Sequence, residues 1–294
     1  MATDRQSGST PAPLAVLLDA LDLETIDHFI FRGKTPPTRL VRIFGGQVAA
    51  QALVAAHRTV PDKAAHSLHA YFLQAGDPAA PVVYEVDPIR DGRTYATRRV
   101  VGVQEGRAIF NLQASFHRPE AGYDRQIPFP DGAAAPEDSA PWEGFGLPRR
   151  AAGQPEDPLP SPSLPFEMRV APPAGGYTRL LWFRTIGAIG DDPTLHDCVA
   201  AYASDLTLLS VAMESWASEA AAAGRPVSLP GFVASLDHAM WFHRPFRVDE
   251  WMLYAQASPS SGDGRGLALG HMFGVDGRLA ITVVQEGALR PPLT

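Results

Sequence analysis

Two stretches of the chain are apolar on nearly every side. They span residues 48–56 and 199–209. A helix that lies on a surface keeps a polar face, so these stretches predict helices that are enclosed by other elements. Along residues 109–116 apolar and polar side chains alternate instead, and a period of two predicts a strand with one buried face. The pattern therefore indicates buried helices combined with strands.

The same order of elements occurs twice along the chain. In the first half the apolar helix precedes "HSLHAYFL" and the hairpin-like "VVGVQEGRAIFNLQASF", and in the second it precedes "SLDHAMWF" and "GHMFGVDGRLAITVVQEG". Asp276-Gly277 is a preferred two-residue hairpin turn because both positions tolerate positive φ, and Glu105-Gly106 takes the matching place. The sequence predicts an α+β unit, a curved antiparallel sheet wrapped on a central helix, that is built twice.

A proline-rich segment separates the two halves. Eleven of the 28 prolines lie between Pro119 and Pro165, in runs such as "PEDPLPSPSLP". Proline removes a backbone donor, so this segment is not expected to hold a helix or a sheet ladder. We predict an N-terminal repeat over residues 1–117, a connector over 118–164 and a C-terminal repeat over 165–294.

Composition narrows the range of partners. The 294 residues carry a formal net charge of -7, which gives no basic field for nucleic acid. Cys198 is the single cysteine, so neither an intramolecular disulfide nor a cysteine-based metal cage can form. No segment approaches the roughly twenty apolar residues of a membrane span. We expect a cytoplasmic protein with no cofactor, no structural metal and no membrane insertion.

One acid stands out in the second apolar stretch. Asp205 is the only charged residue in "AAYASDLTLLSVAM". Burying a lone carboxylate costs several kcal/mol unless it is paired or hydrogen-bonded. Asp205 could serve as a general base, or it could cap a helix that begins at Leu206, since Asp is a favoured N-cap.

Six separated motifs resemble the acyl-CoA thioesterase II family. In chain order they are "FGGQVAAQAL" (44–53), "HSLHAYFLQAGD" (66–77), "RDGRTYATRRV" (90–100), "YASDLTLL" (202–209), "DHAMWFHRPF" (237–246) and "VQEGALR" (284–290). They span nearly the whole chain apart from the connector. The resemblance implies a double hotdog fold, a dimer or tetramer of such units, and hydrolysis of acyl-CoA to a free acid and coenzyme A without a covalent acyl-enzyme.

The resemblance also implies three catalytic residues. An Asp, a Thr or Ser, and a Gln hold the attacking water in this family, and the matching positions are Asp205, Ser235 and Gln285. Serine in place of threonine keeps the hydroxyl and loses the methyl that limits its rotamers. Read without the family, Ser235 and Gln285 are ordinary polar residues of strands.

Candidate substrate contacts lie in the first half. Gly45 and Gly46 precede the first buried helix, where glycine permits close approach and backbone N–H groups point along a favourable dipole; Gln47 follows them. Our hypothesis is that this helix start polarises the thioester carbonyl. Tight packing is the simpler explanation of two glycines taken alone.

Coenzyme A carries phosphates, so arginines are expected where it docks. Arg90, Arg93, Arg98 and Arg99 cluster in one stretch, and alternation sends Arg98 and Arg99 to opposite faces of a strand. We take Arg90 and Arg93 as candidates. His66 is a lower-ranked candidate for a general base, because histidine on a half-buried strand is more often structural.

Two other functions fit parts of the sequence. "GDDPTLH" resembles a hotdog enoyl-CoA hydratase pattern, with Asp191 and His196 at the required spacing, although the Asn-Pro pair of that pattern is absent. A non-catalytic module that binds acyl-CoA is the second alternative. The hydratase is ranked below the thioesterase because many more motifs match the thioesterase. The binding module is ranked below it because such a module has no need of the Asp, Ser and Gln set.

Overall fold

The computed structural model describes residues 12–38, 40–144, 164–224 and 231–290. The first half holds α1 (Ala12–Leu21), β1 (Glu24–Asp27), β2 (Ile30–Gly33), α2 (Gly45–Arg58), β3 (Ala64–Phe72), β4 (Val82–Asp91), β5 (Tyr95–Gln104) and β6 (Arg107–His117). After it come η1 (Pro136–Asp138), β7 (Ala140–Pro141), β8 (Phe166–Ala171), β9 (Arg179–Thr185), α3 (Pro193–Ala222), β10 (Phe232–Ser235), β11 (Asp237–Phe242), β12 (Met252–Gly262), β13 (Arg265–Gly274) and β14 (Leu279–Arg290).

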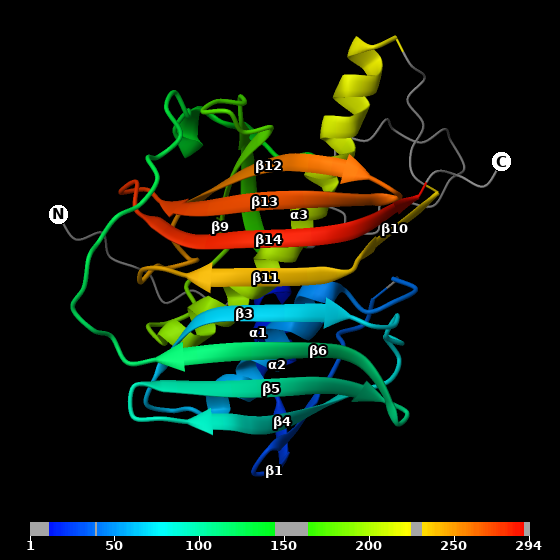
Figure 1. The fold of residues 1–294 in the computed structure, drawn as a ribbon, viewed down its shortest axis with the longest axis vertical. Helices are drawn as coiled ribbons and strands as arrows, with labels where there is room; N and C mark the ends of the chain where they lie inside the picture. Colours follow the sequence, from blue (N-terminus) through cyan, green and yellow to red (C-terminus); the bar gives the residue numbers. More distant parts are fainter. Residues whose placement is uncertain (1–11, 39, 145–163, 225–230, 291–294) are drawn as a thin grey trace.

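One antiparallel sheet runs through both halves. Its order is β1-β2-β4-β5-β6-β3-β11-β14-β13-β12-β9-β8-β7, and β10 pairs with β14 beside this path. The halves join where β3 pairs with β11, in a register that sets His69 opposite Ala239. Figure 1 shows the sheet in front of the helices, with the two halves stacked one above the other. This arrangement, one continuous antiparallel sheet over two central helices, confirms the predicted double hotdog.

Tight hairpins connect the strands. The turn at Asp276-Gly277 differs from the prediction, because only Gly277 has positive φ there, 76°. The predicted turn at Glu105-Gly106 is confirmed. Glu105 and Gly106 both have positive φ, 48° and 75°, between β5 and β6. Asp263 and Gly264 repeat this backbone, with φ of 52° and 71°, between β12 and β13. Two consecutive residues with positive φ match the right-handed twist of the flanking strands, so the turns fix the strand register.

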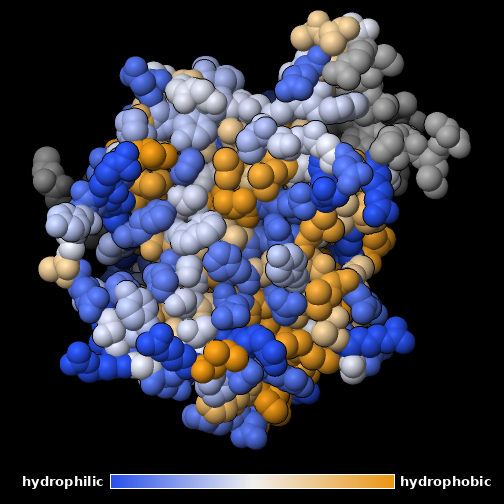
Figure 2. Space-filling model, viewed as in Figure 1, coloured by the Kyte–Doolittle hydropathy of each residue, from blue (hydrophilic) through white to orange (hydrophobic). Residues whose placement is uncertain are grey.

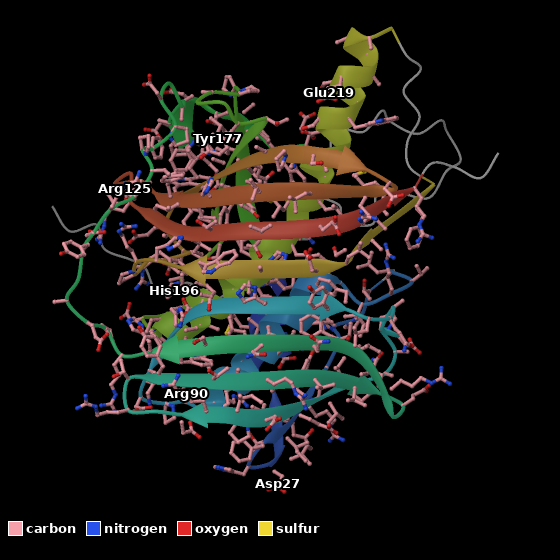
Figure 3. The ribbon with its side chains drawn as sticks, viewed as in Figure 1. Asp27, Arg90, Arg125, Tyr177, His196 and Glu219 are labelled. Carbon is pink, nitrogen blue, oxygen red and sulfur yellow. The ribbon has the colours of Figure 1, made fainter. Side chains whose placement is uncertain are left out.

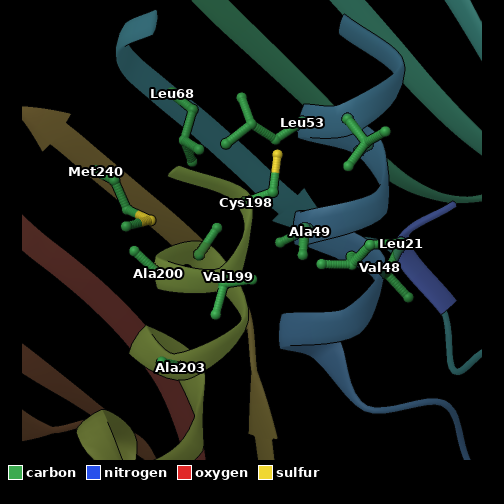
Figure 4. Close-up of a cluster of buried hydrophobic side chains, with 14 of the residues drawn as sticks. Leu21, Val48, Ala49, Leu53, Leu68, Cys198, Val199, Ala200, Ala203 and Met240 are labelled. Atoms are coloured by element: carbon green, nitrogen blue, oxygen red, sulfur yellow. The ribbon is translucent and has the colours of Figure 1, made fainter. Parts of the chain in front are cut away.

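The two central helices pack directly against each other. Ala49 and Leu53 of α2, and Cys198 and Ala200 of α3, are all 0% exposed. Figure 4 shows the small side chains between the helices, with Leu68 of β3 beside them. Alanine at the contact lets the two backbones approach closely, so both apolar helices are enclosed as the sequence predicts. Cys198 is a small core residue, and burial raises the pKa of its thiol.

α3 begins earlier than the apolar pattern suggests. The side chain of Asp192 accepts a hydrogen bond from the Thr194 N–H at 2.9 Å, and Pro193 occupies the first turn. Asp205 therefore lies in the middle of a 30-residue helix. The alternative that Asp205 caps a helix beginning at Leu206 is wrong, because the cap is Asp192.

The connector contributes short elements of its own. The 3-10 turn η1 precedes β7, which pairs with β8 at Ala140↔Val170 and Pro141↔Arg169. The expectation that this segment holds no sheet ladder is wrong at these two residues, which form the sheet edge, where proline is tolerated. Residues 145–163 lie outside the described residues, and the proposed repeat boundaries stay a prediction. In the described part of the chain, no helix is both long and apolar enough to cross a bilayer.

Candidate active site

Three polar side chains from different elements meet at one carboxylate oxygen. Gln285 of β14 donates from Nε2 to Oδ1 of Asp205 at 2.5 Å, and Ser235 of β10 donates from its hydroxyl to the same oxygen at 3.4 Å. The Gln285 amide also donates to the Ser235 hydroxyl at 2.8 Å. The structure thus brings together the three residues that the sequence singles out, although they lie 30 to 80 positions apart.

Gln285 sets the orientation of this cluster. Its side chain is 0% exposed, and its amide nitrogen must face Asp205, because the opposite flip would set two acceptors against each other. That choice leaves the amide oxygen Oε1 buried and without a hydrogen-bond partner among the described residues. A buried acceptor of this kind is a place where a water can donate.

The start of α2 closes the other side of the carboxylate. A Cβ on Gly45 would lie 2.8 Å from Oδ2 of Asp205 and 2.8 Å from the ring of Phe72. A Cβ on Gly46 would lie 2.6 Å from the Tyr202 carbonyl oxygen, and the Gly46 N–H donates to the Asp205 carboxylate. Glycine at 45 and 46 is therefore required for helix–helix contact and for access to the acid.

Burial and hydrogen bonds oppose each other at Asp205. Burial raises its pKa, while hydrogen bonds from Gln285, Gly46 and Ser235 and the positive charge of Arg42 lower it, and the balance is a pKa of about 6. A carboxyl with this pKa is ionised at neutral pH and remains basic enough to take a proton. The arrangement suits general-base chemistry on a water molecule.

The first half of the molecule has no equivalent cluster among its described residues. In the first half, Arg98 of β5 pairs with Ala114 of β6. The equivalent pair in the second half is Ala268 of β13 with Gln285 of β14, so Ala114 takes the place of Gln285. On β3, Ala65 faces Phe116, a position that corresponds to the pairing of Ser235 with Gly287. Ala114 and Ala65 take the places of Gln285 and Ser235, and Phe116 takes the place of Gly287. The part of the chain that the structure describes therefore contains one such cluster rather than two.

Two of the expected substrate contacts are engaged elsewhere. The Gln47 amide donates to the Lys34 carbonyl at 3.4 Å and to the Thr35 hydroxyl at 3.2 Å, so it fastens the loop that follows β2. His66 bonds to the Ser115 hydroxyl at 2.8 Å. Ser115 lies between two inward-facing residues of β6, so His66 is on the outer face of the sheet, opposite the helices.

The candidate arginines lie far from the cluster. Arg90 is on β4, five strands from β14 in the sheet order, which is roughly 24 Å at about 4.8 Å per strand. Figure 3 shows Arg90 at the lower left of the sheet, whereas β10 is at the upper right in Figure 1. Arg93 follows Arg90 in the turn between β4 and β5. Arg98 is 3% exposed and binds Thr59 and Asp91, so it is structural.

The hydratase pair does not converge on a common point. The Asp191 side chain is 95% exposed and pairs with Arg247 at 2.7 Å. His196 is 2% exposed, and its two ring nitrogens bond to the Gly190 carbonyl and the Val248 N–H. Both nitrogens of the imidazole are therefore already occupied by backbone groups.

Sequence reasoning missed Arg42 as a neighbour of the acid. Arg42 lies just before the two glycines, and its guanidinium donates to the Val233 carbonyl of β10 at 2.6 Å. Its positive charge contributes to lowering the pKa of Asp205. Its place two residues before the Phe44–Gly45 turn is the only signal in the chain that could have indicated it. Elsewhere in the described residues, no three His, Cys, Asp or Glu side chains gather as metal ligands.

The fold and the site together define a class of protein, a duplicated hotdog with one buried cluster of a carboxylate, an amide and a hydroxyl. Comparison with known proteins specifies it further. Residues 170–288 match the family model described as acyl-CoA thioesterase, and residues 32–117 match that of the acyl-CoA thioesterase N-terminal domain. The chain belongs to the acyl-CoA thioesterase family.

Individual relatives cover almost the whole chain. Acyl-coenzyme A thioesterase 8 of Mus musculus is 38% identical over 98% of this chain and 92% of its own length. Acyl-CoA thioesterase 2 of Haemophilus influenzae is 38% identical over 93% of this chain and 96% of its own. The crystal structure of an acyl-CoA thioesterase II from Mycobacterium marinum superposes with a TM-score of 0.77 at 41% identity, covering 94% of this chain and 98% of that one.

Proposed function

We propose that this protein hydrolyses acyl-CoA thioesters to a free fatty acid and coenzyme A, with Asp205, Ser235 and Gln285 directing a water molecule. Thioester hydrolysis follows from the family to which the chain belongs. The roles of the three residues are our inference from their convergence on one carboxylate oxygen. Hydration of enoyl-CoA is not favoured, because Asp191 and His196 do not meet.

The reaction proceeds by direct attack of water. Above its pKa, Asp205 accepts one proton from the water while the water oxygen bonds to the thioester carbonyl carbon. Gln285 holds the water through its buried Oε1, and Ser235 and the Gln285 amide hold the carboxylate. The carbonyl becomes an oxyanion that faces the start of α2, where the helix dipole favours negative charge.

Collapse of this intermediate breaks the carbon–sulfur bond. The carbonyl re-forms, coenzyme A leaves as a thiolate, and the proton held by Asp205 passes to the sulfur. Gly45 and Gly46 allow the thioester to approach the backbone there, and no covalent acyl-enzyme is formed. The observation that carries the proposal is the buried carboxylate of Asp205, which accepts hydrogen bonds from both Gln285 and Ser235 at one oxygen.

A thiol-release assay tests this function. Saturated acyl-CoA substrates of increasing chain length are incubated with wild-type protein and with Asp205→Asn, and free coenzyme A is measured. We expect release by the wild-type protein and loss of release by the folded variant. Loss of enoyl absorbance from an unsaturated acyl-CoA without thiol release would instead identify a hydratase. Tight acyl-CoA binding without any turnover would identify a binding module.

We also propose that the chain forms a homo-oligomer, a dimer or tetramer of double hotdog units. The outer sheet face carries the exposed Tyr71 and a ring contact of 5.1 Å between His69 and Trp241. Figure 2 shows apolar side chains interspersed among polar ones on this face. Light scattering after size-exclusion chromatography would give the mass, and a monomer would contradict the proposal. A cytoplasmic location stays a prediction.

A further inference from the structure

β10 forms an edge beside the catalytic cluster. Among the described residues it pairs with β14 alone, from Phe232↔Arg290 to Ser235↔Gly287. Its other edge presents the Val233 carbonyl, which accepts the guanidinium of Arg42. Because β10 ends at Ser235, its first residue lies roughly 10 Å from the catalytic hydroxyl at about 3.3 Å per residue.

Two exposed arginines lie at this edge, and neither has a carboxylate partner in the part of the chain that the structure describes. Arg42 has the single neutral bond to Val233, and Arg290 lies over the ring of Phe232 with its guanidinium carbon 5.5 Å from the centroid. Neither forms an ion pair with any Asp or Glu of the described residues. Nearby Arg265, in contrast, pairs with Asp263 and Glu286. In Figure 2 strongly hydrophilic and apolar residues lie side by side at the edge where β10 runs.

Arg42 and Arg290 differ from most of the arginines whose contacts are described. The net charge is -7, and most arginines for which contacts are described form ion pairs. Guanidinium groups without a carboxylate partner favour phosphate oxygens, which they bind with short charge-assisted hydrogen bonds. Phe232, which is 46% exposed, adds an aromatic face on the same strand.

We propose that Arg42 and Arg290 bind the phosphate groups of coenzyme A, so that the nucleotide end of the substrate lies along the open edge of β10. This inference rests on the proposed function, since it places the substrate's anionic end relative to Asp205. The pantetheine arm then runs along β10 toward Ser235, and the thioester reaches Asp205. Arg90 and Arg93 lie in the other half of the sheet and do not take part.

The placement couples two roles in Arg42. Its charge lowers the pKa of Asp205, and its guanidinium remains accessible to an anion. Arg290 has only the phosphate role, because it is not among the groups that shift the pKa of Asp205. Above the pKa of Asp205, loss of either arginine should therefore weaken phosphate binding alone. At low pH, loss of Arg42 should in addition reduce the ionised fraction of Asp205.

Truncated substrates test the proposal at pH 8, where Asp205 is ionised. Arg42→Gln and Arg290→Gln are assayed by thiol release with an acyl-CoA, with the acyl-dephospho-CoA and with the acyl-pantetheine of the same chain. The matched control is Arg278→Gln, which removes an exposed arginine next to the opposite end of β14. Thermal unfolding checks that each variant is folded.

We expect each of the two variants to raise KM for acyl-CoA roughly tenfold, the size of one charge-assisted contact, with kcat preserved. KM for acyl-pantetheine should not change, and Arg278→Gln should match the wild-type protein on every substrate. Added salt should raise the wild-type KM for acyl-CoA more than that of the double variant, because phosphate contacts are screened.

Unchanged KM for acyl-CoA, or an equal rise for acyl-CoA and acyl-pantetheine, would overturn the docking proposal. Asp205→Asn separates this failure from failure of the proposed catalytic roles. If Asp205→Asn loses turnover on acyl-pantetheine while the arginine variants behave as wild type, only the nucleotide site is wrong. If Asp205→Asn keeps full turnover, the catalytic assignment is wrong whatever the arginines do.

Discussion

The ionised carboxylate of Asp205 should lower the stability of the protein, and this cost can be measured. In an unfolded chain the group titrates near the ordinary aspartate pKa of 3.8, whereas burial in the fold raises the pKa to about 6. At about 1.4 kcal/mol for each pH unit, ionising it in the folded protein costs about 3 kcal/mol. Asp205→Asn removes the charge and keeps an acceptor for the Gln285 amide.

The sign of the pH dependence follows from proton binding. Below pH 3.8 the group is protonated in both states, so it adds no cost. Between the two pKa values the folded state holds a proton that the unfolded state has lost, so wild-type stability falls as the pH rises. Above the folded pKa the full cost is present. The advantage of Asp205→Asn over wild type should therefore grow between about pH 4 and pH 7 and then remain constant.

Urea unfolding at fixed protein concentration measures this difference. The free energies of unfolding of wild type and Asp205→Asn are compared at several pH values, with Asp19→Asn, a substitution at an exposed position of α1, as the control. We expect the gap to widen by up to about 3 kcal/mol for Asp205→Asn. A gap that does not change with pH would refute the argument that burial raises the pKa of Asp205.

Three further substitutions test the geometry around the acid. Gln285→Leu should lower kcat roughly 100-fold. It should also move the acid limb of the pH profile to higher pH, because the wild-type hydrogen bond from Gln285 lowers the pKa of Asp205 and its loss raises that pKa. Gly45→Ala should lower kcat in a folded protein, since the new Cβ would lie 2.8 Å from both the Asp205 carboxylate and Phe72; wild-type kcat would show that the approach is not close. Ser235→Ala should lose activity that Ser235→Thr keeps, and equal activity of both would exclude a role for the hydroxyl.

The fold was largely predictable because its signals are local. Apolar helices, alternating strands and the Glu105-Gly106 turn are patterns of period and φ that a single sequence displays. The start of α3 was missed although Asp192-Pro193 is a recognised helix-start pair, because the apolar pattern begins only later. The extent of the helix decides whether Asp205 is a cap or a mid-helix acid.

The site was predictable only through motifs. Nothing local in Ser235 or Gln285 shows that they reach Asp205, because their contact depends on β10 and β14 pairing across the sheet. For the arginines, a cluster in the sequence was misleading about the position of the site. Arg90 and Arg93 form the visible cluster in sequence, yet β4 is five strands from β14, and the cation that acts on the acid is the isolated Arg42.

The pH dependence of kcat with a saturating acyl-CoA tests most directly whether Asp205 activates water. For the wild-type protein we expect kcat to rise with pH as a single group with a pKa of about 6 ionises, and then to level off. Asp205→Asn should be at least roughly 100-fold slower and show no such rise. A folded Asp205→Asn variant that retains the wild-type rate and profile would contradict the account.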